Sequence, residues 1–160
     1  MRQKTPAESE TVKTEVVCPN DTNPMGILKG GRLVEWMDIA AAVCAQVHAE
    51  KICVTAAINS VAFYEAAGPG DVVTISARIT RSFNTSMEIF VFALAKNILT
   101  GKSDLISEAY FTFVALDNGG KITKAIPVKP VTVSEKQYYE EAMNRKRKAA
   151  VIKNTVRELE

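Results

Sequence analysis

Hydrophobic residues between positions 31 and 51 recur at the spacing of a helix. They form one stripe with residues on both flanks, made up of Leu33, Met37, Ala40, Cys44 and Val47 together with Trp36, Ile39 and Val43. A helix that is apolar on most of its surface is normally buried in a core. A polar turn at 21–24 and three glycines precede this segment. We therefore predict a long buried helix from about Gly31 to positions 49–51, with the rest of the chain packed around it.

Further segments alternate between apolar and polar residues or are rich in β-branched and aromatic residues, as is typical of strands. They lie at residues 11–18, 52–64, 71–81, 87–96 and 105–116, with turn signals at 68–71, 84–86 and 117–120. No helical pattern separates the last four, so the crossover helices that parallel strands require are missing. The pattern predicts an α+β fold in which an antiparallel sheet packs on one central helix.

The two ends of the chain differ from this middle part. Residues 1–10 have few large apolar groups, and we expect them to be disordered. Residues 131–160 contain strong helix formers, with Ser134 as the expected N-cap. Their apolar stripe consists of Tyr138, Ala142, Arg145, Ala149, Ile152, Val156 and Leu159, and Arg145 is its one polar break. This stripe suits docking on the body or on a second subunit, so we divide the chain into 1–10, a domain at 11–130 and a helical extension at 131–160.

Composition narrows the class of protein. A length of 160 residues is enough for one domain, and a net charge of +2 is too small to indicate nucleic acid as the main partner. The three cysteines show no CxxC pair, which is typical of free thiols in a reducing compartment. No apolar run reaches the length of a membrane span, and the N-terminus has no hydrophobic signal core. We expect a cytoplasmic protein that binds neither nucleic acid nor membranes.

Asp38 is the most unusual residue of the predicted helix. No other charged residue lies between it and Glu50, and small alanines one turn away leave room beside the carboxylate. Burying an unpaired carboxylate is unfavourable, so a chain keeps one only with a partner or for a use. Three interpretations stay open: an ion pair with Arg or Lys, a helix edge that water reaches, or a catalytic group.

Several other chemistries lack the residues that they need. The chain has one histidine, His48, and no G-x-S-x-G motif, which excludes a Ser-His-Asp hydrolase. A zinc site would need more histidine and cysteine at ligand spacing. The glycines at 26, 30 and 31 match neither the dinucleotide fingerprint nor the P-loop. No base that could activate Cys44 as a nucleophile is recognisable in the sequence, so we expect Cys44 in the core.

An ordered set of motifs resembles the acyl-CoA thioesterases of the hotdog fold. The glycine loop and helix, from Asp21 to Asp38, match D-T-N-x-x-G-x-x-x-G-G-x-x-x-x-x-M-D. Further matches lie at 54–56, around Phe63, at 70–73, at 81–88 and at 111–117. The resemblance covers about residues 11–130 and is to the branch that includes the cytosolic acetyl-CoA hydrolases and the brown-fat-inducible thioesterases.

This resemblance implies a long helix gripped by a curved antiparallel sheet, an acyl-CoA substrate, and no metal or separate cofactor. It also implies a homo-oligomer whose active unit is a dimer, often a trimer of dimers, with the active site at the dimer interface. Asp38 falls on the catalytic acid of the family. We expect it to activate water as a general base, while backbone N–H groups near Gly30 and Gly31 polarise the thioester carbonyl. Direct attack by the carboxylate is the less favoured route.

One position departs from the family pattern. Related enzymes often carry a polar residue directly after the first glycine of the loop, where this chain has Ile27. If a second polar group is needed, Asn23, Thr55 or Asn59 would supply it; otherwise Asp38 acts alone. Two rivals stay open: a module that binds acyl-CoA or a fatty acid without turnover, as a sensor, and a hydratase, for which His48 is badly placed.

The remaining substrate contacts are expected along a strand edge and at the surface. Thr55, Asn59 and Phe63 are candidates for contacts with the substrate. The phosphates of coenzyme A need basic or N–H-rich partners, for which the candidates are Arg81, Asn84, Thr85, Ser86 and Lys129. The basic cluster at 145–148 is either a further phosphate contact or a solvated face.

Overall fold

The computed structural model describes residues 2–159. Its main elements are β1 (Thr11–Val16), α1 (Gly30–Ala49), β2 (Ile52–Phe63), β3 (Val72–Ser82), β4 (Ser86–Lys96), β5 (Ser103–Leu116), β6 (Ile122–Thr123) and α2 (Val133–Glu158). Two short 3-10 helices occupy Pro6–Glu8 and Pro19–Asp21. The predicted α+β class is confirmed, and each predicted strand boundary lies within two residues of the observed one.

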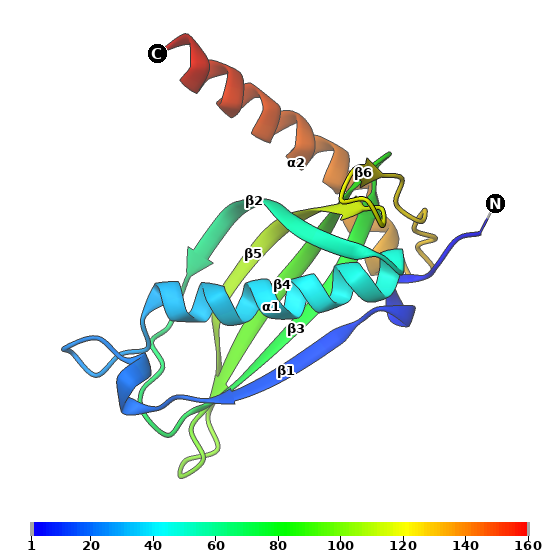
Figure 1. The fold of residues 1–160 in the computed structure, drawn as a ribbon. Coiled ribbons are helices and arrows are strands. Elements are labelled where there is room, and N and C mark those ends of the chain that lie inside the picture. Colours follow the sequence, from blue (N-terminus) through cyan, green and yellow to red (C-terminus); the bar gives the residue numbers. More distant parts are fainter. Residues whose placement is uncertain (1, 160) are drawn as a thin grey trace.

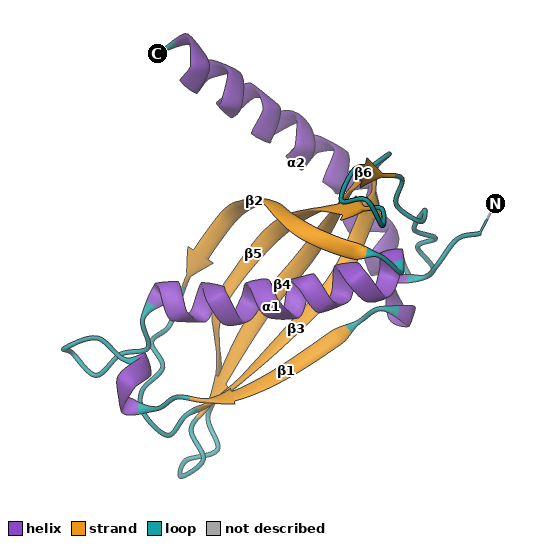
Figure 2. Ribbon diagram, in the orientation of Figure 1, coloured by secondary structure: helices purple, strands orange, loops and turns teal. Residues whose placement is uncertain are grey.

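The strands form one antiparallel sheet in the order β1-β3-β4-β5-β2, and the short β6 pairs with the end of β5. This sheet curves around α1, which lies along its concave side (Figures 1 and 2). β1 and β2 are the two edges of the sheet, and β2 is the longer of the two. The arrangement is the hotdog architecture that the motifs imply.

The core lies between α1 and the concave face of the sheet. Met37 and Cys44 of the helix are fully buried, as are Phe111 and Phe113 of β5. Alanines on the same side of α1 let the helix approach the sheet closely. Cys44 is therefore a core residue, as expected.

One face of α1 differs from the prediction of a helix buried on most sides. Ile39, Val43 and Val47 are each more than 40% exposed in the single chain. The hydrophobic pattern identifies residues that avoid water, but it cannot tell whether the same chain or another one covers them.

The N-terminal segment is ordered, so the prediction of disorder for residues 1–10 is wrong over residues 2–10; residue 1 lies outside the described residues. Lys4 is buried, its N–H donates to the carbonyl of Pro127 (3.1 Å), and its Nζ donates to the carbonyl of Val47 (2.8 Å). The same Nζ pairs with Glu50, 2.8 Å away. The last carbonyls of a helix lack intrahelical partners. Lys4 satisfies one of these carbonyls, and polar contacts of this kind order the segment although it has no hydrophobic cluster of its own.

The C-terminal helix begins slightly earlier than expected. Its N-cap is Thr132 rather than Ser134, because the Thr132 hydroxyl accepts from the Glu135 N–H while the Glu135 carboxylate accepts from the Thr132 N–H. The first half of α2 packs on the sheet face opposite α1, and the second half projects away from the body (Figure 1). Over residues 2–159, neither helix has the length and hydropathy that a membrane span requires.

Candidate active site

Asp38 and Thr55 meet between the middle of α1 and the edge strand β2. The Thr55 hydroxyl donates to Oδ1 of Asp38 over 2.7 Å. Asp38 is only partly buried, and no Lys or Arg side chain within residues 2–159 pairs with it. The ion-pair interpretation of Asp38 is therefore excluded for these residues, and the carboxylate lies at a helix edge that water reaches.

The register of β2 explains why Thr55 faces α1. Thr55 lies opposite Phe113, whose side chain is buried against α1, so both point to the concave face. A β-bulge follows between Thr55 and Ala57, and a second lies between Asn59 and Ala62. Bulges re-aim side chains at sheet edges. β2 pairs with β5 on one side only, so the Asp38–Thr55 pair lies beside an unpaired strand edge.

The start of α1 offers free backbone donors. Leu33 is the first helical residue whose N–H bonds back, to the carbonyl of Lys29, and the cap residue Lys29 supplies no side-chain bond. A Cβ on Gly31 would meet nothing within 4 Å, whereas a Cβ on Gly30 would lie 3.3 Å from the Phe63 ring. Gly31 therefore leaves its backbone open to an approaching ligand, and Gly30 makes room for Phe63.

The loop before α1 is fixed by Asp21 and Asn23. Buried Asp21 forms an ion pair with Arg32 (2.8 Å), and a hydrogen bond from the Cys18 N–H, with Arg32 adding to it, holds the pKa of the Asp21 carboxyl below its usual range. The Asn23 Oδ1 accepts from the N–H groups of Met25 and Ile27. Its Nδ2 group makes no hydrogen bond within the described chain, so it is available to a ligand.

Ile27, the departure from the family pattern, lines an apolar pocket beside the start of α1. This pocket has a volume of about 280 Å³, and Gly30, Leu33, Phe63 and Ile106 are among its walls. An apolar residue at position 27 therefore extends a hydrophobic surface next to the free N–H groups of the helix.

The two halves of the predicted site do not meet within one chain. Asp38 lies eight residues after Gly30 on the same straight helix, so their backbones are about 12 Å apart along the axis. Asn23 lies in the loop before the helix and makes no contact with Asp38 through hydrogen bonds. The structure thus brings Asp38 to Thr55, and Gly30 to Phe63, in separate places.

Asn59 lies on the other face of the sheet. It is opposite Tyr110, which alternates with the buried Phe111, so Asn59 points away from α1. It lines a cavity of about 270 Å³ together with Arg145 and Lys148 of α2. Within one chain, Asn59 therefore lies on the other side of the sheet from Asp38, whereas the Thr55 hydroxyl bonds to the Asp38 carboxylate.

Among residues 2–159, the residues predicted to bind phosphate make no hydrogen bond to Asp38 or Thr55. The Arg81 guanidinium donates to the carbonyl of Tyr139 (3.2 Å) and lies 4.2 Å from the centre of the Tyr139 ring, so it holds α2 to the sheet. Asn84 and Thr85 lie in the turn between β3 and β4, and Ser86 is the first residue of β4. Asn84 lines a surface hollow together with Arg2 and Lys124. Lys129 is exposed, and its N–H bonds to the carbonyl of Lys4.

Sequence reasoning missed the network that Glu88 forms. Glu88 is buried, accepts from the Thr80 hydroxyl (2.6 Å) and pairs with Arg145 of α2 (2.7 Å). The one signal in the sequence was the arginine that interrupts an otherwise apolar stripe, which indicates a buried acid facing it. Among residues 2–159, no group of three His, Cys, Asp or Glu side chains lies together as a metal site requires.

The chain is similar to several known proteins. The model of the thioesterase superfamily matches residues 25–101. An uncharacterized acyl-CoA thioester hydrolase of Bacillus subtilis, YkhA, is 35% identical, with 93% of this chain and 91% of that protein covered. Mouse acetyl-coenzyme A thioesterase is 34% identical over 82% of this chain, which spans about a quarter of that longer protein (23%).

Solved structures give the same result. A hexameric acyl-CoA thioesterase in its apo form superposes with a TM-score of 0.88 at 38% identity, covering 94% of this chain and 99% of the other. An acyl-CoA hydrolase of Staphylococcus aureus, in complex with butyryl coenzyme A, coenzyme A and coenzyme A disulfide, has a TM-score of 0.88 at 35% identity, with 99% of each chain covered. Three variants of that enzyme replace one asparagine, one aspartate or one threonine by alanine, and these residues are spaced along its chain as Asn23, Asp38 and Thr55 are along this one. This chain therefore belongs to the thioesterase superfamily.

Proposed function

We propose that the protein hydrolyses acyl-CoA thioesters to the free carboxylic acid and coenzyme A, with Asp38 as general base. The observation that carries this proposal is the partly exposed carboxylate of Asp38, which pairs with no Lys or Arg side chain of residues 2–159 and accepts from the Thr55 hydroxyl beside an open strand edge. Relatives named as acyl-CoA thioester hydrolases, and a structural neighbour with coenzyme A bound, support the substrate class.

The hydrogen bond from Thr55 sets the geometry of the base. Because it engages Oδ1 of Asp38, Oδ2 stays free to accept from a water molecule and to remove its proton as the water attacks the thioester carbon. The leaving group is a thiolate with a pKa of about 8.5, by analogy with cysteine, so its departure needs little acid assistance. One carboxylate is therefore sufficient for the chemistry.

The start of α1 would stabilise the oxyanion. The free N–H groups at Gly30 and Gly31 point out of the positive end of the helix dipole, and Gly31 leaves the backbone uncovered. The Nδ2 group of Asn23, in the loop that leads into α1, would be a further donor. The acyl chain would then extend into the apolar pocket that Ile27, Leu33 and Phe63 line.

The distance between these groups requires two copies of the chain. Backbone donors that are about 12 Å from Asp38 along the helix cannot hold the carbonyl that its water attacks. We place Asp38 and Thr55 of one copy against Gly30, Gly31 and Asn23 of another, in a dimer formed through the open edges of β2. The hexameric neighbours support a homo-oligomer, and a trimer of such dimers is the assembly that we propose.

Thiol release from a panel of acyl-CoAs, short to long, tests this function. We expect turnover by the wild type and a loss of about 10² to 10⁴-fold in kcat for Asp38→Asn, the range for a general base. Glu35→Gln is the matched control, since Glu35 is an exposed acid one turn earlier on α1 that pairs with Arg32. Saturable binding of acyl-CoA without thiol release would instead support the sensor, and full activity of Asp38→Asn would place the base elsewhere.

A further inference from the structure

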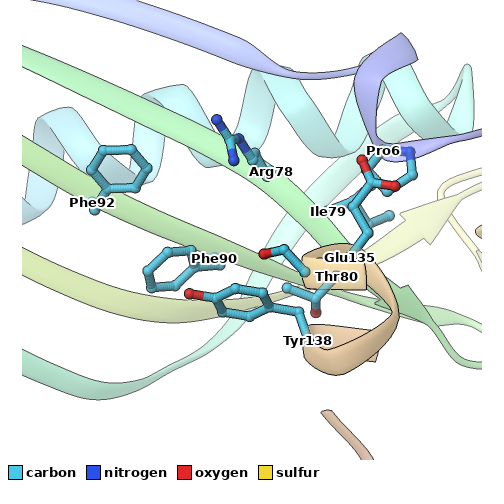
Figure 3. A pocket seen from close by; sticks show the side chains of 9 residues that line it. Pro6, Arg78, Ile79, Thr80, Phe90, Phe92, Glu135 and Tyr138 are labelled. Atoms are coloured by element: carbon cyan, nitrogen blue, oxygen red, sulfur yellow. The ribbon is translucent and has the colours of Figure 1, made fainter. Parts of the chain in front are cut away.

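The first half of α2 is fixed to the sheet through three positions of its stripe. The Tyr138 ring stacks on Phe90 of β4, with ring centres 5.1 Å apart (Figure 3), and Ala142 is fully buried. Arg145 makes a bidentate ion pair with buried Glu88 and lies over the Tyr110 ring, 4.2 Å from its centre. Every stripe position up to Arg145 therefore has a partner in the same chain.

The second half of α2 continues this stripe with residues that stay largely exposed to solvent within residues 2–159. Ile152, Val156 and Leu159 follow Arg145 at the same spacing, and Ile152 is 65% exposed. In proteins, most of the stability of a helix comes from packing of its apolar face rather than from intrinsic propensity. The exposed stripe therefore indicates a surface that something else covers.

The path of α2 shows where that surface lies. Residues 138 and 139 contact β3 and β4, Arg145 contacts β4 and β5, and Lys148 and Ile152 line a cavity with Asn59 and Ser60 of β2. The helix thus crosses the sheet in strand order and reaches its open edge at β2. Residues 152–159 continue for about 10 Å, the width of two strands. Figure 1 shows this end of α2 projecting beyond β2.

Apolar residues of β2 lie on the face that carries α2. Cys53 pairs with Ala115, and both are buried against α1, so the neighbouring Ile52 and Val54 point to the opposite face, where they are exposed. A two-fold axis near the middle of β2 would set two such edges antiparallel. It would bring Ile52 and Val54 of one copy to the second half of the other copy's strand, the half in which Asn59 and Ser60 line a cavity with α2.

We infer that the distal half of α2 packs across the dimer seam onto the second copy, with Ile152 and Val156 seated on the partner's Ile52 and Val54. The inference rests on the β2-edge dimer proposed above and gives it a second set of contacts. The α2 helix of each copy would pack on the sheet of the other copy. The two helices would thus join the copies on the face of the sheet away from the proposed active sites.

The test compares self-association of three proteins by sedimentation over a dilution series. Ile152→Glu/Val156→Glu places charges in the inferred contact, and we expect its dissociation constant to rise about tenfold or more. Val151→Glu is the matched control, because Val151 is 64% exposed on the same turn but off the stripe, and we expect no change. Equal association of all three proteins would overturn the inference.

Cross-linking and a membrane assay complete the test. With Cys18 replaced by Ser, Val54→Cys on one tagged chain and Val156→Cys on a differently tagged chain should form a mixed disulfide under oxidation with copper phenanthroline. The distal half of α2 is also basic, so wild type and double variant are sedimented with vesicles that contain anionic phosphatidylserine. Vesicle binding that the double variant loses, with unchanged self-association, would overturn the inference in favour of a membrane surface.

Thiol release measured on the same samples separates this inference from the proposed function. A double variant that associates and hydrolyses like the wild type refutes the helix contact alone. A wild type that associates through α2 but releases no thiol refutes the proposed function alone.

Discussion

At the scale of single residues, the two adjacent glycines at the start of α1 have different surroundings. The Cα of Gly30 lies under the Phe63 ring, whereas the Cα of Gly31 faces open space. A glycine in a helix lowers stability relative to alanine, so its presence at an open position needs another reason. Close approach of a substrate to the backbone is such a reason.

We predict that Gly31→Ala loses activity without losing stability. The added methyl meets no protein atom, and alanine favours the helix, so the free energy of unfolding should stay the same or rise by up to about 1 kcal/mol. The methyl would stand where the thioester approaches, and kcat/KM should fall by about tenfold or more. Thiol-release kinetics and urea unfolding measure the two effects. Unchanged kcat/KM would show that the substrate does not approach there.

Gly30→Ala serves as the comparison. Its methyl would lie 3.3 Å from the Phe63 ring, so Phe63 must shift and stability should not rise. A loss of activity in Gly30→Ala is therefore ambiguous between displaced Phe63 and a blocked backbone, whereas a loss in Gly31→Ala is not.

The sequence predicts individual residues of the site unequally. Asp38 is recognisable as an isolated acid among apolar residues, and the resemblance assigns its role. Thr55 is known only through the resemblance, because a threonine in a strand carries no signal of its own. The face of the sheet on which Asn59 lies depends on a β-bulge in β2, because a bulge shifts the alternation of side chains. No pattern in the sequence reveals this bulge.

At the scale of elements, the end of α1 is held by the N-terminal segment and by His48. His48 is fully buried, its Nε2 lies 2.8 Å from the carbonyl oxygen of Ile126, and its Nδ1 has no partner among the described residues. Burial, the largest cause, lowers the pKa of His48, and nearby Lys4 lowers it further, whereas the Ile126 carbonyl and the acids Glu8 and Glu50 act in the opposite direction. The ring is therefore neutral in the folded protein near neutral pH.

This gives a prediction for the pH dependence of stability. The unfolded chain binds a proton at His48 below its ordinary pKa of about 6.5, whereas the folded protein does not until a lower pH. Stability is therefore fully present above pH 6.5 and should fall as the pH drops below it, by at most about 1.4 kcal/mol per pH unit. Urea unfolding at pH 7.5 and pH 5.5 measures the change.

His48→Gln is the control, because glutamine keeps an N–H donor for the Ile126 carbonyl and does not titrate. His48 is the only histidine of the chain, and the paired Glu50 has a pKa of about 2, so its contribution is lost only below about pH 4.5. The variant should show little difference between the two pH values. An equal fall in both proteins would assign the effect to other groups.

The elements themselves were predictable where their pattern is regular. Alternation identified the strands, and helical spacing identified α1, since both follow from burial against one core. The order of the N-terminal segment was not predictable, because it depends on Lys4 reaching the carbonyl of Val47, a contact between residues 43 positions apart.

At the scale of the whole molecule, one chain has an open sheet edge at β2 and, in the function that we propose, carries two half-sites. Asp38, the proposed base, lies in the middle of α1, and the N–H groups of Gly30 and Gly31 lie at its start, so the rise of the helix sets the distance between them. The proposed site is therefore complete only when two copies of the chain meet. The consequence is that variants in different halves should complement each other.

We predict that Asp38→Asn and Asn23→Ala, each nearly inactive alone, recover activity when mixed. In a mixed dimer, one site combines two substituted residues and the other combines Asp38 and Asn23, both unchanged. Random mixing in equal amounts makes half of the dimers mixed, with one intact site in two, so about a quarter of the wild-type rate should return. The chains are unfolded and refolded together, and thiol release is measured against each variant refolded alone.

A second mixture serves as the control for exchange and refolding. Asp38→Asn mixed with Thr55→Ala places both substitutions in the same half-site, because Thr55 and Asp38 of one chain are hydrogen-bonded. No mixed dimer of these two variants has an intact site, so the rate should stay at the level of the single variants. Recovery in the first mixture but not in the second would locate Asp38 and Thr55 on one chain and Asn23 on the other. Absence of recovery in the first mixture, with exchange shown by two affinity tags, would mean that each chain completes its own site, and Asp38 would then act without the donors at the start of α1.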